Sequence, residues 1–240
     1  MSRLPGWVAG MTRSCVHVLA AGVLAFAGAL AAQSASEGNF RDKLWNIVTT
    51  CVGAEDADYC QRCDAPRADS ACQHGRRCED TTEVWDKTSE YVAIRDVKMC
   101  SCPAGFVHGL AIPRTKVKGI EASPLPHGIW AFAWAVAQGK IADGSTIALV
   151  VNSARGRSQD QLHVHLVRLR EDARRNFTGR MASVLRLDDV WNAVSQLAAN
   201  QPPLKDYNVL VASDLKGGFE VLVENNDKSL ERTYTQRTCR

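Results

Sequence analysis

The stretch from Val150 to Leu169 constrains the fold more than any other part of this sequence. It begins with the end of an apolar strand, passes through a polar turn and returns to a strand that contains His163 and His165. Because strand side chains alternate with a period of two, both histidines and Gln161 are predicted to share one face. The intervening apolar residues are then predicted to face a core, and they are Leu162, Val164 and Leu166.

The polar turn before the second strand adds groups that suit phosphate chemistry. Asn152 and Ser158 provide hydrogen-bond donors, and Arg155 and Arg157 provide positive charge. Beside two imidazoles, these groups predict an anion-binding site. Two alternatives stay open at this point. One is a structural pair of half-buried strand histidines, and the other is an H-x-H zinc site, for which the nearby sequence offers no obvious third ligand.

The order of these residues resembles the histidine triad (HIT) superfamily. In that superfamily a turn ending in Gly-Gln-Ser precedes a strand with three alternating histidines. Here Gly156-Arg157-Ser158 precedes the strand, and Gln161, His163 and His165 take the alternating positions. The sequence departs from the pattern twice, at Arg157 and at Gln161. A shifted register would put Val167 in the third position, but the spacing from the serine disfavours it.

More of the chain resembles the bacterial CDP-diacylglycerol pyrophosphatases, a membrane-associated HIT branch. The likeness covers roughly residues 40–240 and is based on an ordered set of stretches at 90–96, 108–113, 116–121, 130–134 and 152–157. It implies a HIT-like α+β fold with a mainly antiparallel sheet and flanking helices. It also implies hydrolysis of CDP-diacylglycerol to CMP and phosphatidate through a nucleotidyl-histidine, with no cofactor and no metal.

The resemblance assigns roles to individual residues. His163 would be the nucleophile, and His165 would contact the phosphate and help to protonate the departing oxygen. Gln161 would orient the nucleophile, although an amide cannot titrate. His108 resembles a family histidine that supports the site, and a purely structural role for it is equally favoured. The alternative function is a non-catalytic protein that binds a nucleotide or a lipid headgroup, with Gln161 marking lost turnover.

Residues 1–32 predict a signal peptide or an N-terminal membrane anchor. Arg3 and Arg13 precede an uncharged run of 17 residues, Val16–Ala32, and Ala29-Leu30-Ala31 offers a cleavage site. A run of this length is the lower limit for a helix that crosses a bilayer. Both cleavage and retention are therefore compatible with the leader.

The working domain, residues 37–240, is expected outside the cytoplasm. It is either exported to the periplasm or held on the periplasmic side of a bacterial inner membrane, near a lipid surface, whether Met1 or Met11 is the true start. The formal net charge of +3 is too small to indicate nucleic-acid binding. Lys116 and Lys118 suit phosphates or anionic lipid headgroups, and a solvated loop is an equally favoured interpretation.

The cysteines support the same compartment, because an even number in an exported chain is typical of disulfides. Eight follow the leader: Cys51, Cys60, Cys63, Cys72, Cys78, Cys100, Cys102 and Cys239. Residues 53–88 are polar and poor in large aliphatic side chains, so they are predicted to form a disulfide-rich insert. A zinc site at Cys60, Cys63, Cys72 and Cys78 is a weaker alternative, and a redox role for Cys60-x-x-Cys63 is weaker still.

The periodicity of apolar residues predicts an α+β domain. Strands are expected at 90–97, 106–112, 146–152, 161–169, 208–213 and 218–223. Helices are expected at 39–52, 126–138 and 187–199, with another that begins near 171.

Overall fold

The computed structural model describes residues 40–52, 82–225 and 229–239. From Arg41 onward these residues belong to one compact unit. The predicted leader and residues 53–81 of the predicted cysteine-rich insert lie outside the described residues. None of the described helices is long and apolar enough to span a bilayer.

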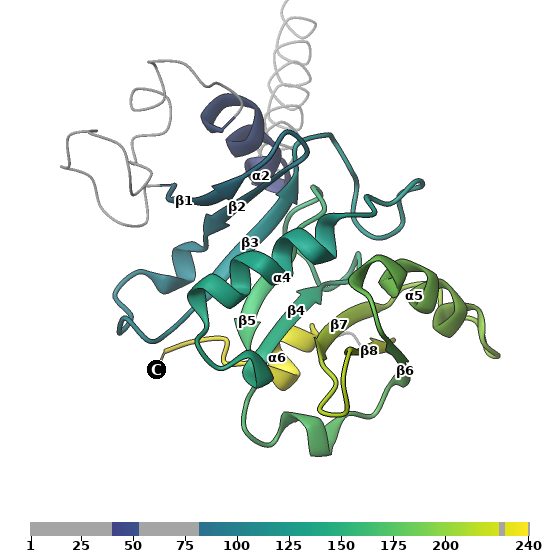
Figure 1. Ribbon diagram of the computed structural model, residues 1–240. Coiled ribbons are helices and arrows are strands. Elements are labelled where there is room, and N and C mark those ends of the chain that lie inside the picture. The colour runs from purple at the N-terminus through teal and green to yellow at the C-terminus, as the bar shows by residue number, and fades with distance from the viewer. Residues whose placement is uncertain (1–39, 53–81, 226–228, 240) are drawn as a thin grey trace, which may run out of the picture. The chain divides into compact units, whose positions relative to one another are not determined.

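One sheet of eight strands organises the described part of the chain (Figure 1). Its strand order is β1-β2-β3-β5-β4-β7-β8-β6, and each neighbouring pair is antiparallel. This confirms the predicted α+β class with a mainly antiparallel sheet. The strands are β1 Val84–Lys87, β2 Tyr91–Arg95, β3 His108–Pro113, β4 Ile147–Val151, β5 Val164–Arg168, β6 Arg180–Val184, β7 Asn208–Ser213 and β8 Phe219–Glu224.

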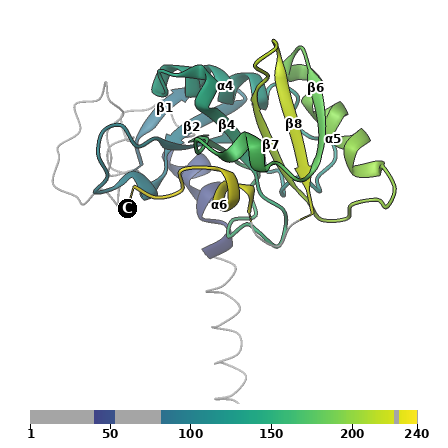
Figure 2. The same ribbon diagram turned by 90° about the horizontal axis from the view of Figure 1, so that it is seen from below.

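Helices cover both faces of this sheet, with α4 and α6 on opposite sides (Figure 2). α4 is rich in alanine and large apolar residues, and its buried side pairs Trp130 with Trp191 of α5. The helical elements are α2 Lys43–Asn46, η1 Ile47–Cys51, η3 Val97–Met99, α4 Ile129–Lys140, η4 Gly144–Thr146, η5 Ala173–Asn176, η6 Leu187–Asp189, α5 Val190–Ala199 and α6 Leu230–Tyr234.

Alternation along β5 assigns the side chains to the two faces of the sheet. Leu162, Val164 and Leu166 join the main core with α4 and α5, as predicted. His165 faces the other side, opposite Leu110 of β3, which packs in the cluster under α2. Val167 packs in the cluster under α6. Polar groups on the histidine face therefore lie between two apolar clusters that shield them from water.

Four elements differ from the expectation. β1 occupies the end of the range assigned to the insert, and the helix expected near residue 171 is only the short turn η5. β6 follows it as an edge strand that pairs with β8 alone. Its side chains alternate between half-buried and exposed, so it lacks the apolar run typical of a buried strand. The short helix α6 has no counterpart among the predicted elements.

Candidate active site

His163, immediately before β5, is held with a defined tautomer. Its Nδ1 lies 2.8 Å from the backbone carbonyl oxygen of Gln161. A carbonyl oxygen only accepts, so Nδ1 carries the proton and Nε2 keeps its lone pair. No described residue hydrogen-bonds Nε2, and this atom is not sealed from solvent. The residue as a whole is 7% exposed, so a nitrogen that can form a bond lies in an almost fully buried side chain.

His165 is hydrogen-bonded at both ring nitrogens. Its Nε2 lies 3.1 Å from Nδ2 of Asn152, directly after β4, and its Nδ1 lies 3.2 Å from Nε2 of His108 on β3. Because an amide nitrogen donates, Nε2 of His165 accepts and Nδ1 carries the proton. The ring centroids of His163 and His165 are 4.8 Å apart. The fold therefore brings together three histidines and the asparagine that the sequence singles out.

Two buried carboxylates adjoin these rings. Glu231 of α6 lies 3.5 Å from Nδ1 of His165 and 3.7 Å from Nε2 of His108. Asp96, which precedes η3, lies 3.4 Å from the same nitrogen of His108. Neither acidic residue is among the site residues predicted from the sequence. Asp96 ends one of the stretches that carry the family likeness, whereas Glu231 has no recognisable sequence signal.

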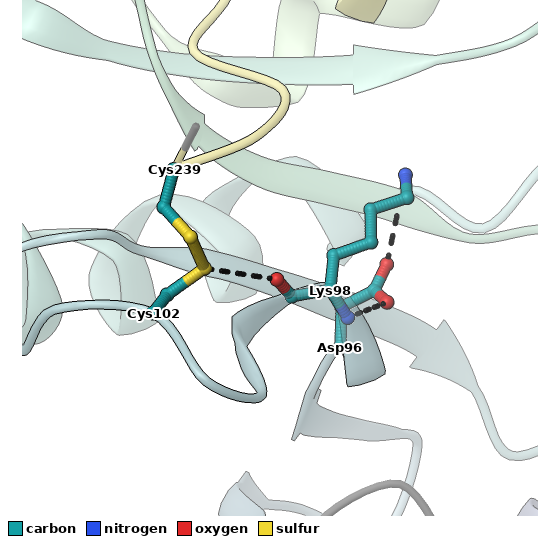
Figure 3. The surroundings of a disulfide bond; sticks show 4 residues. All are labelled: Asp96, Lys98, Cys102 and Cys239. Atoms are coloured by element: carbon teal, nitrogen blue, oxygen red, sulfur yellow. Dashed lines mark hydrogen bonds and ion pairs between the residues drawn. A yellow bond between two sulfur atoms is a disulfide. The ribbon is translucent and has the colours of Figure 1, made fainter.

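Two cations balance the carboxylates. Nζ of Lys98 lies 2.5 Å from Glu231 and 3.9 Å from Asp96, and Figure 3 shows the contact with Asp96. Nε of Arg237 lies 3.7 Å from Glu231. The term "histidine cluster" is used below for these two cations, the two carboxylates and their neighbours: Asp96, Lys98, His108, Asn152, His163, His165, Glu231 and Arg237.

Burial and the two cations keep the imidazoles neutral. Burial lowers the pKa of His163 below the usual value of 6.5. Burial, together with the charge of Lys98, lowers the pKa values of His108 and His165 well below that value. Burial raises the pKa of Glu231, but Lys98, His108 and Arg237 together outweigh it and the net pKa is lowered. At neutral pH the cluster therefore holds neutral rings and an ionised Glu231.

The side chain of Gln161 holds the loop that follows β3. Its Oε1 accepts from the backbone N–H of Val117 at 3.1 Å. Its Nε2 donates to the carbonyl oxygens of Pro113 and Thr115 at 3.0 and 2.8 Å. Both amide hydrogens are thus engaged with the backbone, while the carbonyl of the same residue orients His163. The structure places this amide against the loop and shows no side-chain bond from it to the histidines.

Replacing Gln161 by histidine would restore the first histidine of the triad pattern. A neutral imidazole has one donor and one acceptor, so it cannot make all three bonds of the amide. We expect Gln161→His to lower the free energy of unfolding by about 1–3 kcal/mol, measured by urea titration. Gln196→His, on the exposed side of α5, is the control. A Gln161→His protein as stable as the parent would contradict this role.

The arginines of the turn are engaged by carboxylates. Arg157 is buried and bonds Glu121 through both terminal nitrogens. Arg155 is exposed and pairs with Asp206 at 2.9 Å. Ser158 is exposed. No hydrogen bond that the structure records between described residues joins these three side chains to the histidine cluster, so their contact with phosphate remains a prediction.

Asp96, His108 and His165 are the described residues that come closest to a metal-binding group. Their ligand atoms lie within 4.8 Å of one another. However, Lys98 and Arg237 already bring positive charge to the adjacent carboxylate of Glu231. A divalent cation would be repelled by both, so the charges disfavour a resident metal. The predicted zinc alternative at Cys60, Cys63, Cys72 and Cys78 lies outside the described residues.

A disulfide ties the C-terminal segment to the loop after η3. It joins Cys102 to Cys239 across 137 residues of sequence. Sγ of Cys102 lies 3.3 Å from the carbonyl oxygen of Lys98 (Figure 3). Cys100 is also disulfide-bonded. The prediction of disulfides is therefore confirmed for these cysteines, and the stapling of the insert remains a prediction.

The site has a buried imidazole with an accessible lone pair, next to hydrogen-bond donors. This arrangement is typical of enzymes that attack phosphate esters or anhydrides. A family model described as CDP-diacylglycerol pyrophosphatase matches residues 39–202, more than half of the 240-residue chain. The chain belongs to this family of hydrolases. A comparison with individually curated proteins gave no match. The matched region includes the three clustered histidines and ends before α6.

Proposed function

We propose that this chain hydrolyses CDP-diacylglycerol to CMP and phosphatidate through a covalent nucleotidyl intermediate on His163. Family membership supports the substrate. The observation that carries the covalent mechanism is the bond from Nδ1 of His163 to the carbonyl of Gln161, which leaves the Nε2 lone pair for attack. The likeness of the strand to the triad of HIT proteins supports the same assignment.

In the first step Nε2 of His163 attacks the phosphorus next to the cytidine. An N–P bond forms, and the bond from that phosphorus to the bridging oxygen breaks. Phosphatidate departs with the electron pair. The imidazole gains positive charge, and the Gln161 carbonyl that accepts its Nδ1–H stabilises this charge.

In the second step a water molecule attacks the same phosphorus. The N–P bond breaks, CMP is released, and the ring of His163 returns to its neutral form with the proton still on Nδ1. One water molecule is consumed, and its proton leaves with the products. Each step replaces one bond to phosphorus by another, so His163 is regenerated without a cofactor.

His165 and Asn152 are proposed to act on the phosphates. Asn152 donates to Nε2 of His165 at 3.1 Å. A bound pyrophosphate is anionic, so it favours the protonated form of the adjacent imidazole. His165 can then donate to the departing oxygen while Asn152 donates to a phosphate oxygen. The turn residues Arg155, Arg157 and Ser158 are proposed to bind phosphate from farther out.

The pH dependence of kcat/KM follows from the tautomer and burial of His163. Only the neutral ring is nucleophilic, and burial lowers its pKa below 6.5. The reactive form therefore persists below pH 6.5, and we expect activity to fall only as the pH drops through a lower value. Initial rates of CMP release at low substrate concentration, from about pH 4.5 to 8, give this profile. An acid limb centred above 6.5 would contradict the assignment.

Rapid quenching tests the intermediate directly. Purified protein is mixed with CDP-diacylglycerol in detergent micelles, quenched in base at short times and digested for mass spectrometry. A cytidylyl group on His163 is the expected result, since N-phosphoryl bonds survive base and are cleaved by acid. An adduct on another residue, or full turnover without any adduct, would overturn the covalent mechanism.

The lipid substrate suggests a location at a membrane. We propose that residues 1–32 act as leader or anchor and that the domain works on the periplasmic side of a bacterial inner membrane. Lys116 and Lys118 are exposed in the loop that Gln161 holds beside the site. Positive charge beside the site supports the proposed approach of an anionic headgroup. No observation favours the non-catalytic alternative, because the family is one of hydrolases.

A further inference from the structure

We infer that Glu231 is a positioning residue of the active site, and that its carboxylate fixes the orientation and charge of His165. The matched family region ends at residue 202, so it does not reach this residue. The inference deepens the proposed function, because His165 and His163 are the proposed reacting pair.

Packing of α6 buries Glu231 toward the histidines. Leu230 and Tyr234 of the same helix belong to the apolar cluster under α6. Ser229 caps the helix by accepting a hydrogen bond from Arg232. Glu231 is consequently only 3% exposed, although an apolar side chain would be buried here at lower cost. A buried carboxylate at this position therefore calls for an explanation beyond stability.

The contacts of Glu231 divide into two kinds. Its Oε2 lies 3.5 Å from Nδ1 of His165, which carries the proton because Asn152 donates to the opposite nitrogen. Its Oε1 lies 2.5 Å from Nζ of Lys98 and 3.7 Å from Nε of Arg237. Oε2 is thus directed at His165, whereas Oε1 is directed at the cations and also lies 3.7 Å from Nε2 of His108. This arrangement keeps Nε2 of His165 toward Asn152 and the proposed phosphate position.

The carboxylate also offsets the positive charges that face the rings. Lys98 on η3 and Arg237 on the C-terminal segment lower the pKa of His165. Glu231 and Asp96 act in the opposite direction and raise the pKa of His163. The other groups that face the rings are neutral, namely His108 from β3 and Asn152 after β4. Removing the charge of Glu231 would leave the cations dominant around the rings and hold His163 at a lower pKa.

The disulfide keeps this helix in place. Cys239 lies on the segment that follows α6, and its partner Cys102 lies in the loop that follows Lys98. The C-terminal segment also bonds the sheet through the backbone N–H of Gln236 and the carbonyl of Arg168 at 2.9 Å. The disulfide therefore links the loop that follows Lys98 to the segment that follows Glu231.

Two substitutions separate the charge of Glu231 from its polar contact with His165. Glu231→Gln keeps an acceptor and removes the charge. Glu231→Met removes both. We expect kcat to fall about 10-fold in the first variant and about 100-fold in the second, with little change in KM. The acid limb of kcat/KM should move to lower pH in Glu231→Gln, which a merely structural role would not produce.

Glu224→Gln is the matched control. Glu224 is a buried carboxylate that bonds the Tyr234 hydroxyl of the same helix at 2.6 Å, with no recorded contact to the histidines. It should weaken the docking of α6 and leave the pH profile unchanged. Equal losses in the control and the Glu231 variants, or Glu231 variants with parental kcat and pH profile, would overturn the inference.

A measurement without substrate separates this inference from the proposed function. Nitrogen NMR of labelled histidine reports which ring nitrogen of His165 is protonated. We expect the Nδ1–H form in the parent and a mixture of tautomers in Glu231→Met. If the parent released no CMP, the proposed function would fail while this result still supported the positioning role. An unchanged tautomer in Glu231→Met would overturn the inference, whatever the turnover.

Discussion

Replacement of His163 by alanine is expected to reduce CMP release from CDP-diacylglycerol by at least about 10⁴-fold. Among the described residues, the variant loses the one ring nitrogen whose lone pair is accessible and whose tautomer is fixed by a backbone bond. No other described imidazole is equivalent, because His165 is bonded at both nitrogens and His108 is fully buried. The measurement is the initial rate in detergent micelles, with CMP quantified by chromatography.

A second histidine variant provides the control for this experiment. His127→Ala changes an exposed histidine before α4 and should leave the rate within about twofold of the parent. The His163→Ala protein should keep its circular dichroism spectrum and its affinity for a CDP-diacylglycerol analogue. A folded His163→Ala protein that retains more than about a hundredth of parental activity would rule out this residue as nucleophile.

Replacement of His165 by alanine is expected to lower kcat by about 10²–10⁴-fold with the natural substrate, since a proton donor to the departing oxygen is lost. The loss should be much smaller with the p-nitrophenyl ester of CMP, whose leaving group needs little protonation. Release of p-nitrophenol gives the rate for this ester. His163→Ala should be inactive on both substrates, because it lacks the nucleophile. Equal losses on the two substrates in His165→Ala would contradict a proton-donor role.

Local periodicity was enough to predict the face on which the histidines lie. Alternating residues from Gln161 to His165 show a clear period of two, and the structure separates them from Leu162 and Val164 as expected. The preceding strand, β4, also follows from its apolar composition. Asn152 was placed with the histidines correctly, because the antiparallel pairing of β4 and β5 brings the end of one strand beside the start of the other.

The charged half of the histidine cluster was beyond prediction from local patterns. Lys98 and Glu231 are 133 residues apart in the chain, and their contact depends on the docking of α6. A single acidic residue in a polar segment is typical of a solvent-exposed helix. β6 escaped prediction for a related reason, because an edge strand with one solvated face has only a weak apolar signal.

Two residues assigned to the site have structural partners that sequence alone does not reveal. Arg157 is bonded to Glu121 and Gln161 to the loop at Pro113, and both partners precede these residues by more than thirty positions. A cationic or amide side chain in a turn is compatible with ligand binding or with internal bonding. Only the tertiary positions of the partners distinguish these possibilities.

The span of sequence between the two halves of the histidine cluster has a consequence for biosynthesis. While translation is still at β8, a nascent chain already contains the imidazoles but has not yet gained the carboxylate of α6 or the cysteine beyond it. The Lys98–Glu231 ion pair and the Cys102–Cys239 disulfide can therefore form only after the C-terminal segment has been made. A chain that ended at β8 would contain the imidazoles and lack the residue inferred to position His165.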